Sequence, residues 1–123
     1  MTLEEKIAMA QTIRSRDRFG PVSPEELAAL PGTETEIHIP VEGGRTVHVY
    51  EERPDGLPAK AALVLNFHGG GFIKGRTDRD RRYCRTIMER LNALVWDVDY
   101  CVAPEAPFPA AVEETYGIIA YAF

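Results

Sequence analysis

Residues 61–67, AALVLNF, run directly into residues 68–72, HGGGF. The first seven form a nearly continuous apolar run, which is typical of a strand buried on both faces of a parallel sheet. Three consecutive glycines after such a strand indicate unusual backbone angles or the close approach of another group, because glycine is otherwise costly in conformational entropy. At the carboxyl end of a parallel strand that group is often a ligand. A tight turn without a ligand is the alternative.

The residues that follow extend this strand into a strand–helix–strand unit. Thr77 is a natural N-cap for a helix with Asp78 and Asp80 in its first turn. The predicted apolar side of this helix consists of Tyr83, Ile87 and Leu91, with Cys84 and Met88 alongside. Its arginines are predicted to form a solvated face: Arg79, Arg81, Arg82 and Arg85. Residues 93–99 are the next apolar strand.

A proline-rich loop at residues 103–109 leads into a last helix that runs to the end of the chain. Its predicted apolar stripe consists of Val112, Tyr116, Ile119 and Phe123. The fold class is therefore α/β.

The first part of the chain predicts two helices and a hairpin. Residues 3–18 have the amphipathic pattern of a first helix. Ser23 followed by Pro24 predicts the start of a second helix, which Pro31 and Gly32 end. The hairpin joins two alternating segments through a three-residue loop at 42–44, which pairs Ile39 with Val47 and puts the apolar side chains on one face. We expect a helical segment at 1–32 and an α/β domain part at 33–123.

Composition excludes several classes of protein. The 123 residues carry 14 Lys and Arg against 19 Asp and Glu, for a net charge of −5. An acidic balance argues against a nucleic-acid partner or an anionic membrane surface. No apolar run approaches the roughly 20 residues of a membrane span, and the first residues, MTLEEK, are not an apolar signal. We expect a cytoplasmic location and two reduced thiols, Cys84 and Cys101.

The glycine loop fits neither common phosphate motif. A dinucleotide fingerprint would need glycine at position 74, where Lys74 stands, and a Walker-type loop would need Lys-Ser or Lys-Thr after Gly75, where Arg76 stands. A loop of this kind can instead aim successive backbone N–H groups at one negative oxygen. Such an oxyanion hole contributes about 3 kcal/mol or more to an acyl-transfer step.

Two segments resemble a known family. Residues 67–72, FHGGGF, are similar to the HGGG oxyanion signature of lipases and esterases, and residues 99–110, DYCVAPEAPFPA, resemble the DYRLAPEHPFPA segment of the same group. This group is the hormone-sensitive-lipase-like branch of α/β hydrolases, which includes the bacterial family IV carboxylesterases. The resemblance covers residues 33–123, and the N-terminal helices resemble the cap of that family. It implies the N-terminal portion of an α/β-hydrolase fold, truncated before the nucleophile elbow.

The resemblance also implies roles for the loop. Gly70 and Gly71 would supply the oxyanion N–H groups, Gly69 would allow the turn, and His68 would brace the loop without being the catalytic histidine. The proline-rich segment would form the wall beside the active site, where Cys101 and Ala106 replace the usual Arg and His. The implied substrate is a small carboxylic ester, with no cofactor and no metal.

The catalytic triad of that family is missing from the sequence. A serine esterase needs a nucleophile in G-x-S-x-G, but Ser15 and Ser23 are not flanked by glycines. The three histidines, His38, His48 and His68, all precede the positions where the family places its triad. This chain alone is therefore predicted to be inactive. It is a fragment of an esterase, a chain completed by a second polypeptide, or a non-catalytic interaction module.

The sequence gives little support for a cysteine nucleophile or a metal site. Cys84 and Cys101 have no His–acid pair in the sequence. His38 and His48 face each other in the hairpin register, but the sequence indicates no third ligand, so they are predicted to be plain exposed histidines. Without a neighbour, strand 61–67 would be an apolar sheet edge that invites another chain or a second copy. We therefore expect the isolated polypeptide to be unstable as a monomer.

Overall fold

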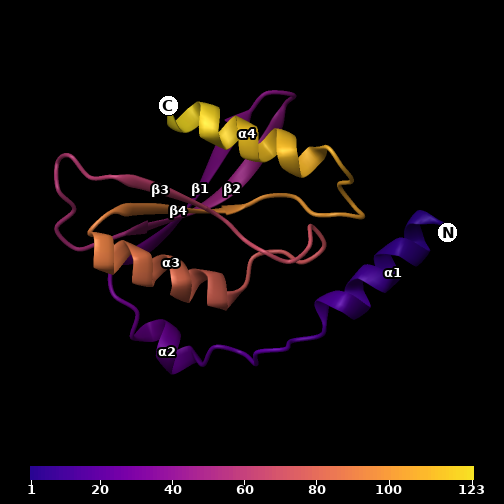
Figure 1. The fold of residues 1–123 in the computed structure, drawn as a ribbon, viewed down its shortest axis with the longest axis horizontal. Coiled ribbons are helices and arrows are strands. Elements are labelled where there is room, and N and C mark those ends of the chain that lie inside the picture. The colour runs from indigo at the N-terminus through magenta and orange to yellow at the C-terminus, as the bar shows by residue number, and fades with distance from the viewer.

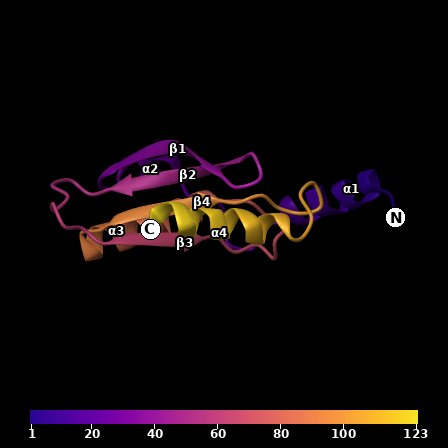
Figure 2. The same cartoon turned by 90° about the horizontal axis from the view of Figure 1, so that it is seen from above.

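Four strands form one mixed sheet in a computed structural model that describes all 123 residues. The strands are β1 (Thr33–Val41), β2 (Arg45–Arg53), β3 (Leu63–Phe67) and β4 (Leu94–Asp99), in the spatial order β1-β2-β4-β3. The helices are α1 (Leu3–Arg14), α2 (Pro24–Ala28), α3 (Asp78–Leu91) and α4 (Ala110–Ala122). α3 and α4 lie on opposite faces of the sheet, and α1 extends away from its end (Figures 1 and 2). None of the four helices combines the length and the hydrophobicity of a membrane-spanning segment.

Both predicted supersecondary units are confirmed. β1 and β2 form an antiparallel hairpin in which Ile39 lies opposite Val47 and Ile37 opposite Val49, the register that the three-residue loop predicts. β3 and β4 are parallel and α3 lies between them in the chain. Ser23 caps α2, since its hydroxyl accepts the N–H of Glu26 at 3.1 Å. α1 ends four residues earlier than predicted.

β3 lies at the edge of the sheet, as predicted for this strand when no other strand of the chain pairs with its outer side. The prediction that it is buried on both faces is wrong here. Leu63 and Phe67 keep 37% and 36% of their surface exposed, because β4 covers only one side of the strand. The outer backbone edge of β3 therefore has no partner within the chain.

The face of the sheet under α4 holds the larger apolar core. Its buried members are Ile39, Val47, Val49, Val98, Tyr100, Ala111 and Ile118. α4 approaches β1 closely at Gly117, where an added Cβ would stand 2.6 Å from the Cβ of Val41. This glycine is what brings Ala111 and Ile118 down onto the sheet.

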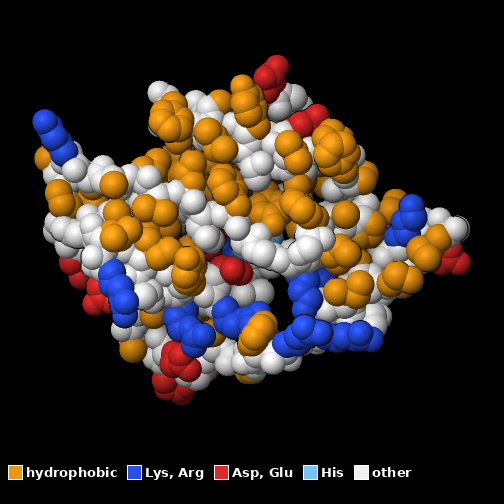
Figure 3. Space-filling model, viewed as in Figure 1, with side chains coloured by type: hydrophobic (Ala, Val, Ile, Leu, Met, Phe, Trp, Pro, Cys, Tyr) orange, Lys and Arg blue, Asp and Glu red, His pale blue; other side chains and the backbone are white.

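The apolar stripe predicted for α4 is therefore on the wrong side. Val112 is 51% exposed, Tyr116 69% and Ile119 39%, and Phe123 is fully exposed. The helix is apolar on two sides, and the side with Ala111 and Ile118 is the one that packs against the sheet. Figure 3 shows the resulting band of apolar side chains across the upper part of this view, where α4 and β3 lie.

The apolar side of α3 is also rotated from the prediction. Cys84 and Met88 are buried against Val95 of β4, whereas Tyr83 and Leu91 are 59% and 64% exposed. Cys84 and Met88, four residues apart, share the face that packs on the sheet, and Tyr83 points away from it. Leu91 is the last residue of the helix and is exposed at its end.

Beneath α3 the sheet carries charges rather than a continuous apolar core. Glu34, Glu52 and Asp97 stand on neighbouring strands, and Glu52 and Asp97 are fully buried. Arg81 binds Glu34 through two contacts of 2.8 and 2.7 Å, and the Nε of Arg85 donates to Glu52 at 2.8 Å. Arg76 contacts both Asp97 and Glu34. The arginines of α3 are thus not all on a solvated face, because Arg81 pairs with the partly buried Glu34 and Arg85 with the buried Glu52. These six residues are called the buried ion network below.

Two carboxyls of the buried ion network have opposite pKa shifts. Burial and the adjacent negative Glu34 raise the pKa of Glu52 to about 8, against the effect of Arg85. Burial alone would raise the pKa of Glu34 as well, but hydrogen bonding with Glu52 and Arg81 and the charge of Arg76 lower it to about 2. Within the pair, a proton is therefore held more tightly by Glu52 than by Glu34.

Stability should consequently fall as the pH rises toward 8. A carboxyl whose folded pKa lies above its unfolded value binds its proton more tightly in the folded state, so its contribution is full below about pH 4.5 and is lost by about pH 8. Glu52→Gln keeps a neutral hydrogen-bonding group and should remove a decline of a few kcal/mol across that window. Urea unfolding at several pH values between those limits measures it.

The matched control is Glu42→Gln, at an exposed position of the hairpin loop. It should keep the pH dependence of the original chain. An identical pH dependence in Glu52→Gln would contradict a protonated Glu52.

Candidate active site

The glycine loop begins one residue after β3 ends, and three successive residues in it have positive φ angles. Gly70 has φ 127° and Gly71 φ 62°, and Phe72 follows with φ 60°. A Cβ on Gly70 would stand 2.7 Å from the Cβ and the carbonyl oxygen of Lys74. The carbonyl of Gly70 accepts the N–H groups of Ile73 and Lys74 at 3.2 and 3.0 Å. The sequence prediction of a tight, unusual turn is therefore confirmed.

The other polar groups of this loop remain available. The N–H groups of Gly69, Gly70 and Gly71 donate no hydrogen bond within the chain. Above Gly71 there is open space, with no atom within 4 Å of the position that a Cβ would take. A run of free N–H groups at the end of a strand is suited to receive an anionic oxygen.

His68 is fixed on three sides. Its Nδ1 lies 2.8 Å from the carbonyl oxygen of Gly69, and its ring stacks on Tyr100 with centroids 4.1 Å apart and planes 3° from parallel. The hydroxyl of Tyr100 donates to the backbone carbonyl of His68. The buried Nε2 lies 3.6 Å from a carboxylate oxygen of Asp99 and makes no hydrogen bond. His68 thus joins the loop to the end of β4.

The proline-rich segment lies against the same loop. The N–H of Ala103 donates to the carbonyl of Phe72 at 2.8 Å, and Asp99 accepts the N–H of Arg76 at 3.4 Å. The Ala103–Pro104 and Phe108–Pro109 bonds are both cis. The two segments that resemble one family in sequence are therefore in direct contact.

Arg14 links α1 to both loops, a role that sequence reasoning missed. Its guanidinium donates to the carbonyls of Ile73 and Ala103 at 2.8 and 3.0 Å and binds both carboxylate oxygens of Glu105 at 2.8 Å. The hydrogen bond from Arg14 lowers the pKa of Glu105 to about 2. A signal was present, because Arg14 continues the stripe of Ile7 and Ala10 where an apolar residue would be expected.

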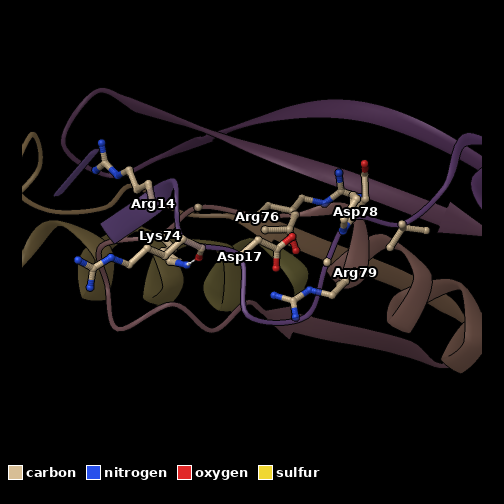
Figure 4. A pocket seen from close by; sticks show the side chains of 12 residues that line it. Arg14, Asp17, Lys74, Arg76, Asp78 and Arg79 are labelled. Atoms are coloured by element: carbon tan, nitrogen blue, oxygen red, sulfur yellow. Dashed lines mark hydrogen bonds between the residues drawn. The ribbon is translucent and has the colours of Figure 1, made fainter. Parts of the chain in front are cut away.

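Two cavities of different character flank the loop. One has about 410 Å³ and is mostly apolar, and its lining includes Phe67, His68, Phe72, Val112 and Ile119. The other has about 390 Å³ and lies between the end of α1 and the start of α3. Figure 4 shows its charged lining, with Arg14, Lys74, Arg76 and Arg79 against Asp17 and Asp78.

Neither the serines nor the cysteines of the chain form a nucleophilic centre. Ser15 donates its hydroxyl to the carbonyl of Thr12 at the end of α1, and Ser23 caps α2. Burial and the nearby Asp97 raise the pKa of the Cys84 thiol far above its usual range. Burial and Glu114 raise the pKa of Cys101 to about 11. Both thiols are therefore protonated at neutral pH, and a protonated thiol is a poor nucleophile.

The histidine pair of the hairpin has one neighbour that the sequence prediction did not include. His38 and His48 do face each other, with ring centroids 4.2 Å apart, but they have a third neighbour in Glu36. Glu36 lies two residues before His38 on the same strand and shares its face. The alternation of β1 was sufficient to predict this neighbour.

Comparisons with known proteins agree with the fold and with the two segments. A family model described as the alpha/beta hydrolase fold matches residues 64–123. Human hormone-sensitive lipase is 35% identical over 92 residues, which are 75% of this chain and 8% of the lipase. Esterase LipI of Mycobacterium tuberculosis is 47% identical over 58 residues, which are 47% of this chain and 18% of that protein.

Solved structures give the same result over nearly the whole chain. An esterase from Pyrobaculum calidifontis superposes with a TM-score of 0.69 at 29% identity, over 98% of this chain and 35% of its own. The chain therefore spans about a third of this esterase and a smaller share of the two relatives above. Together with the glycine loop at the end of β3, these matches identify the chain as the N-terminal part of an α/β hydrolase of the hormone-sensitive-lipase-like, family IV carboxylesterase group.

Proposed function

We propose that this chain is the N-terminal portion of a carboxylic ester hydrolase and that residues 68–71 supply its oxyanion hole. The observation that carries this proposal is the glycine loop itself. Its N–H groups are free, it lies at the carboxyl end of a parallel strand, and contacts from Tyr100 and Ala103 hold it in place. The attacking serine, its acid and its histidine come from residues outside this chain.

The chemistry assigned to the loop is electrostatic. Attack on an ester carbonyl places negative charge on the carbonyl oxygen in the tetrahedral intermediate. Donors that already point at that oxygen stabilise the charge without having to reorganise, and one such donor is worth about 3–4 kcal/mol. Gly70 and Gly71 are the proposed donors, and Gly69 permits the turn. His68 is a positioning residue, because its Nδ1 contacts the carbonyl of Gly69 and its ring stacks on Tyr100.

Three exposed surfaces of this chain support the proposal that further strands of the hydrolase pack against it. The outer edge of β3, the exposed stripe of α4 and the apolar cavity with Phe67 and Phe72 are continuous with one another. A parallel strand next to β3 would cover the outer edge of β3 and bury the exposed stripe of α4. The substrate that suits the apolar cavity is a small carboxylic ester, which would bring its carbonyl to the glycine loop.

A non-catalytic interaction module is the second candidate, and one observation favours it. β3 offers an unpaired apolar edge, which can pair with another chain or a second copy regardless of any chemistry at the loop. The experiments below separate the two candidates.

The isolated chain should not hydrolyse p-nitrophenyl acetate or butyrate, because it contains no activated nucleophile. Its rate should equal that of Gly70→Pro, in which the loop is disrupted. Spectrophotometric release of p-nitrophenol measures both. A rate clearly above that of the variant would mean that a nucleophile within these 123 residues has been overlooked.

Activity should appear when the chain is mixed with a polypeptide that carries the remaining strands, the G-x-S-x-G elbow, the acid and the histidine of a related esterase. In that complex Gly70→Ala should lower kcat about 100-fold or more while KM changes little, because the loop would act in the transition state. Gly43→Ala is the matched control: it alters a glycine of positive φ in the hairpin loop, away from the site, and should leave kcat unchanged. Activity that is indifferent to Gly70→Ala would remove the oxyanion assignment.

The isolated chain should self-associate through β3. Light scattering should give a mass above that of one chain, and Leu63→Lys with Phe67→Lys should return it toward a monomer, since charged residues on an edge strand oppose pairing. Both positions are already partly exposed, so the double change does not empty the core. A sharp monomer peak from the unchanged chain, with cooperative unfolding, would contradict this expectation.

A further inference from the structure

A cluster of ligating side chains lies on the exposed face of the hairpin, apart from the glycine loop. His38 of β1 and His48 of β2 are direct partners in the antiparallel register. Glu36 stands one step along the same face of β1. The ligand atoms of all three lie within 4.8 Å of one another.

A single oxygen holds this cluster together. Oε1 of Glu36 lies 3.2 Å from Nε2 of His38 and 3.0 Å from Nδ1 of His48. Four-coordinate Zn²⁺ with ligand bonds of about 2.0–2.2 Å places its ligand atoms about 3.3–3.5 Å apart. The separations to Glu36 are therefore close to those of a tetrahedral site, and small side-chain rotations would open the centre for an ion.

The composition of the cluster suits a divalent transition metal. Two imidazoles and one carboxylate bring one negative charge when both histidines are neutral, and imidazole is a preferred ligand of Zn²⁺, Cu²⁺ and Ni²⁺. The opposing residue of β4, Asp99, adds a further carboxylate beside His48 in the sheet register. Arg76 lies over the ring of Tyr50 on the same strand as His48 and is itself bound to Asp97 and Glu34.

The cluster is reachable from solution and is held in place from behind. The three side chains are 44–54% exposed. The intervening residues Ile37, Val47 and Val49 point to the opposite face, where Val47 and Val49 are fully buried. The backbone on both sides of the cluster is thus fixed by the core, which preorganises the ligands.

We propose that Glu36, His38 and His48 form a binding site for one divalent transition-metal ion, with Zn²⁺ as the expected occupant. The ion would be bound by one ring nitrogen of each neutral imidazole and by a carboxylate oxygen of Glu36. Its fourth position would remain open to water. Bound there, it would cross-link β1 to β2 and fix the hairpin register.

The test is a titration of the metal-free chain with Zn²⁺ at about pH 7.5, where histidine is mostly neutral. Isothermal calorimetry should find one site per chain. Glu36→Gln, His38→Asn and His48→Asn should each weaken binding more than about ten-fold, because each removes one of three ligands. Glu42→Gln, an exposed glutamate of the same hairpin, is the matched control and should bind as the original chain does.

A second readout does not depend on comparing variants. Co²⁺ in place of Zn²⁺ should give visible absorption of a four-coordinate site without the near-ultraviolet band of a thiolate ligand, which would indicate Cys101 instead. Zn²⁺ should also protect His38 and His48 from modification by diethyl pyrocarbonate, as read by mass spectrometry.

Three results would overturn the proposal. They are the absence of a saturable site, an affinity unchanged by both His38→Asn and His48→Asn, and a thiolate band in the Co²⁺ spectrum. The three proposed ligands lie outside residues 68–71, so these results and the tests of the ester-hydrolase proposal can be told apart.

Discussion

The contact between Tyr100 and His68 is the interaction on which the site depends. Tyr100 follows β4 and His68 follows β3, so the stacked rings and the hydroxyl-to-carbonyl hydrogen bond join the ends of two parallel strands. The glycine loop leaves from this junction, and its three free N–H groups have a defined position only because the junction is rigid. Arg14 and Ala103 then attach α1 and the proline-rich segment to the same loop.

Local patterns were sufficient to predict the elements. The apolar run at 61–67, the cap at Ser23 and the alternation around Ile39 and Val47 each have a cause within a few residues, and each predicted element is present, although β3 is not buried on both faces. The glycine loop was also predictable, since no other residue tolerates the φ of Gly70. The roles of the loop residues in catalysis remain a proposal.

What failed depended on partners far away in the sequence. α4 is apolar on two sides, and only the close approach of Gly117 to Val41 determines which side is buried. Arg81 and Arg85 looked like solvated charges because their carboxylate partners lie on β1 and β2, more than thirty residues earlier. Glu36 was the exception, because strand alternation alone places it beside His38.

The buried ion network has a kinetic consequence. The hairpin and the β3–α3–β4 unit each close over short stretches of chain, but β2 and β4 pair residues as distant as His48 and Asp99. Pairing β2 with β4 therefore has the largest loop-closure entropy cost and should form last. The hairpin brings Glu34 and Glu52 to this pairing, and the β3–α3–β4 unit brings Asp97, Arg76 and Arg85. The final step of folding must therefore desolvate positive and negative side chains together. The rate of this step should depend on ionic strength.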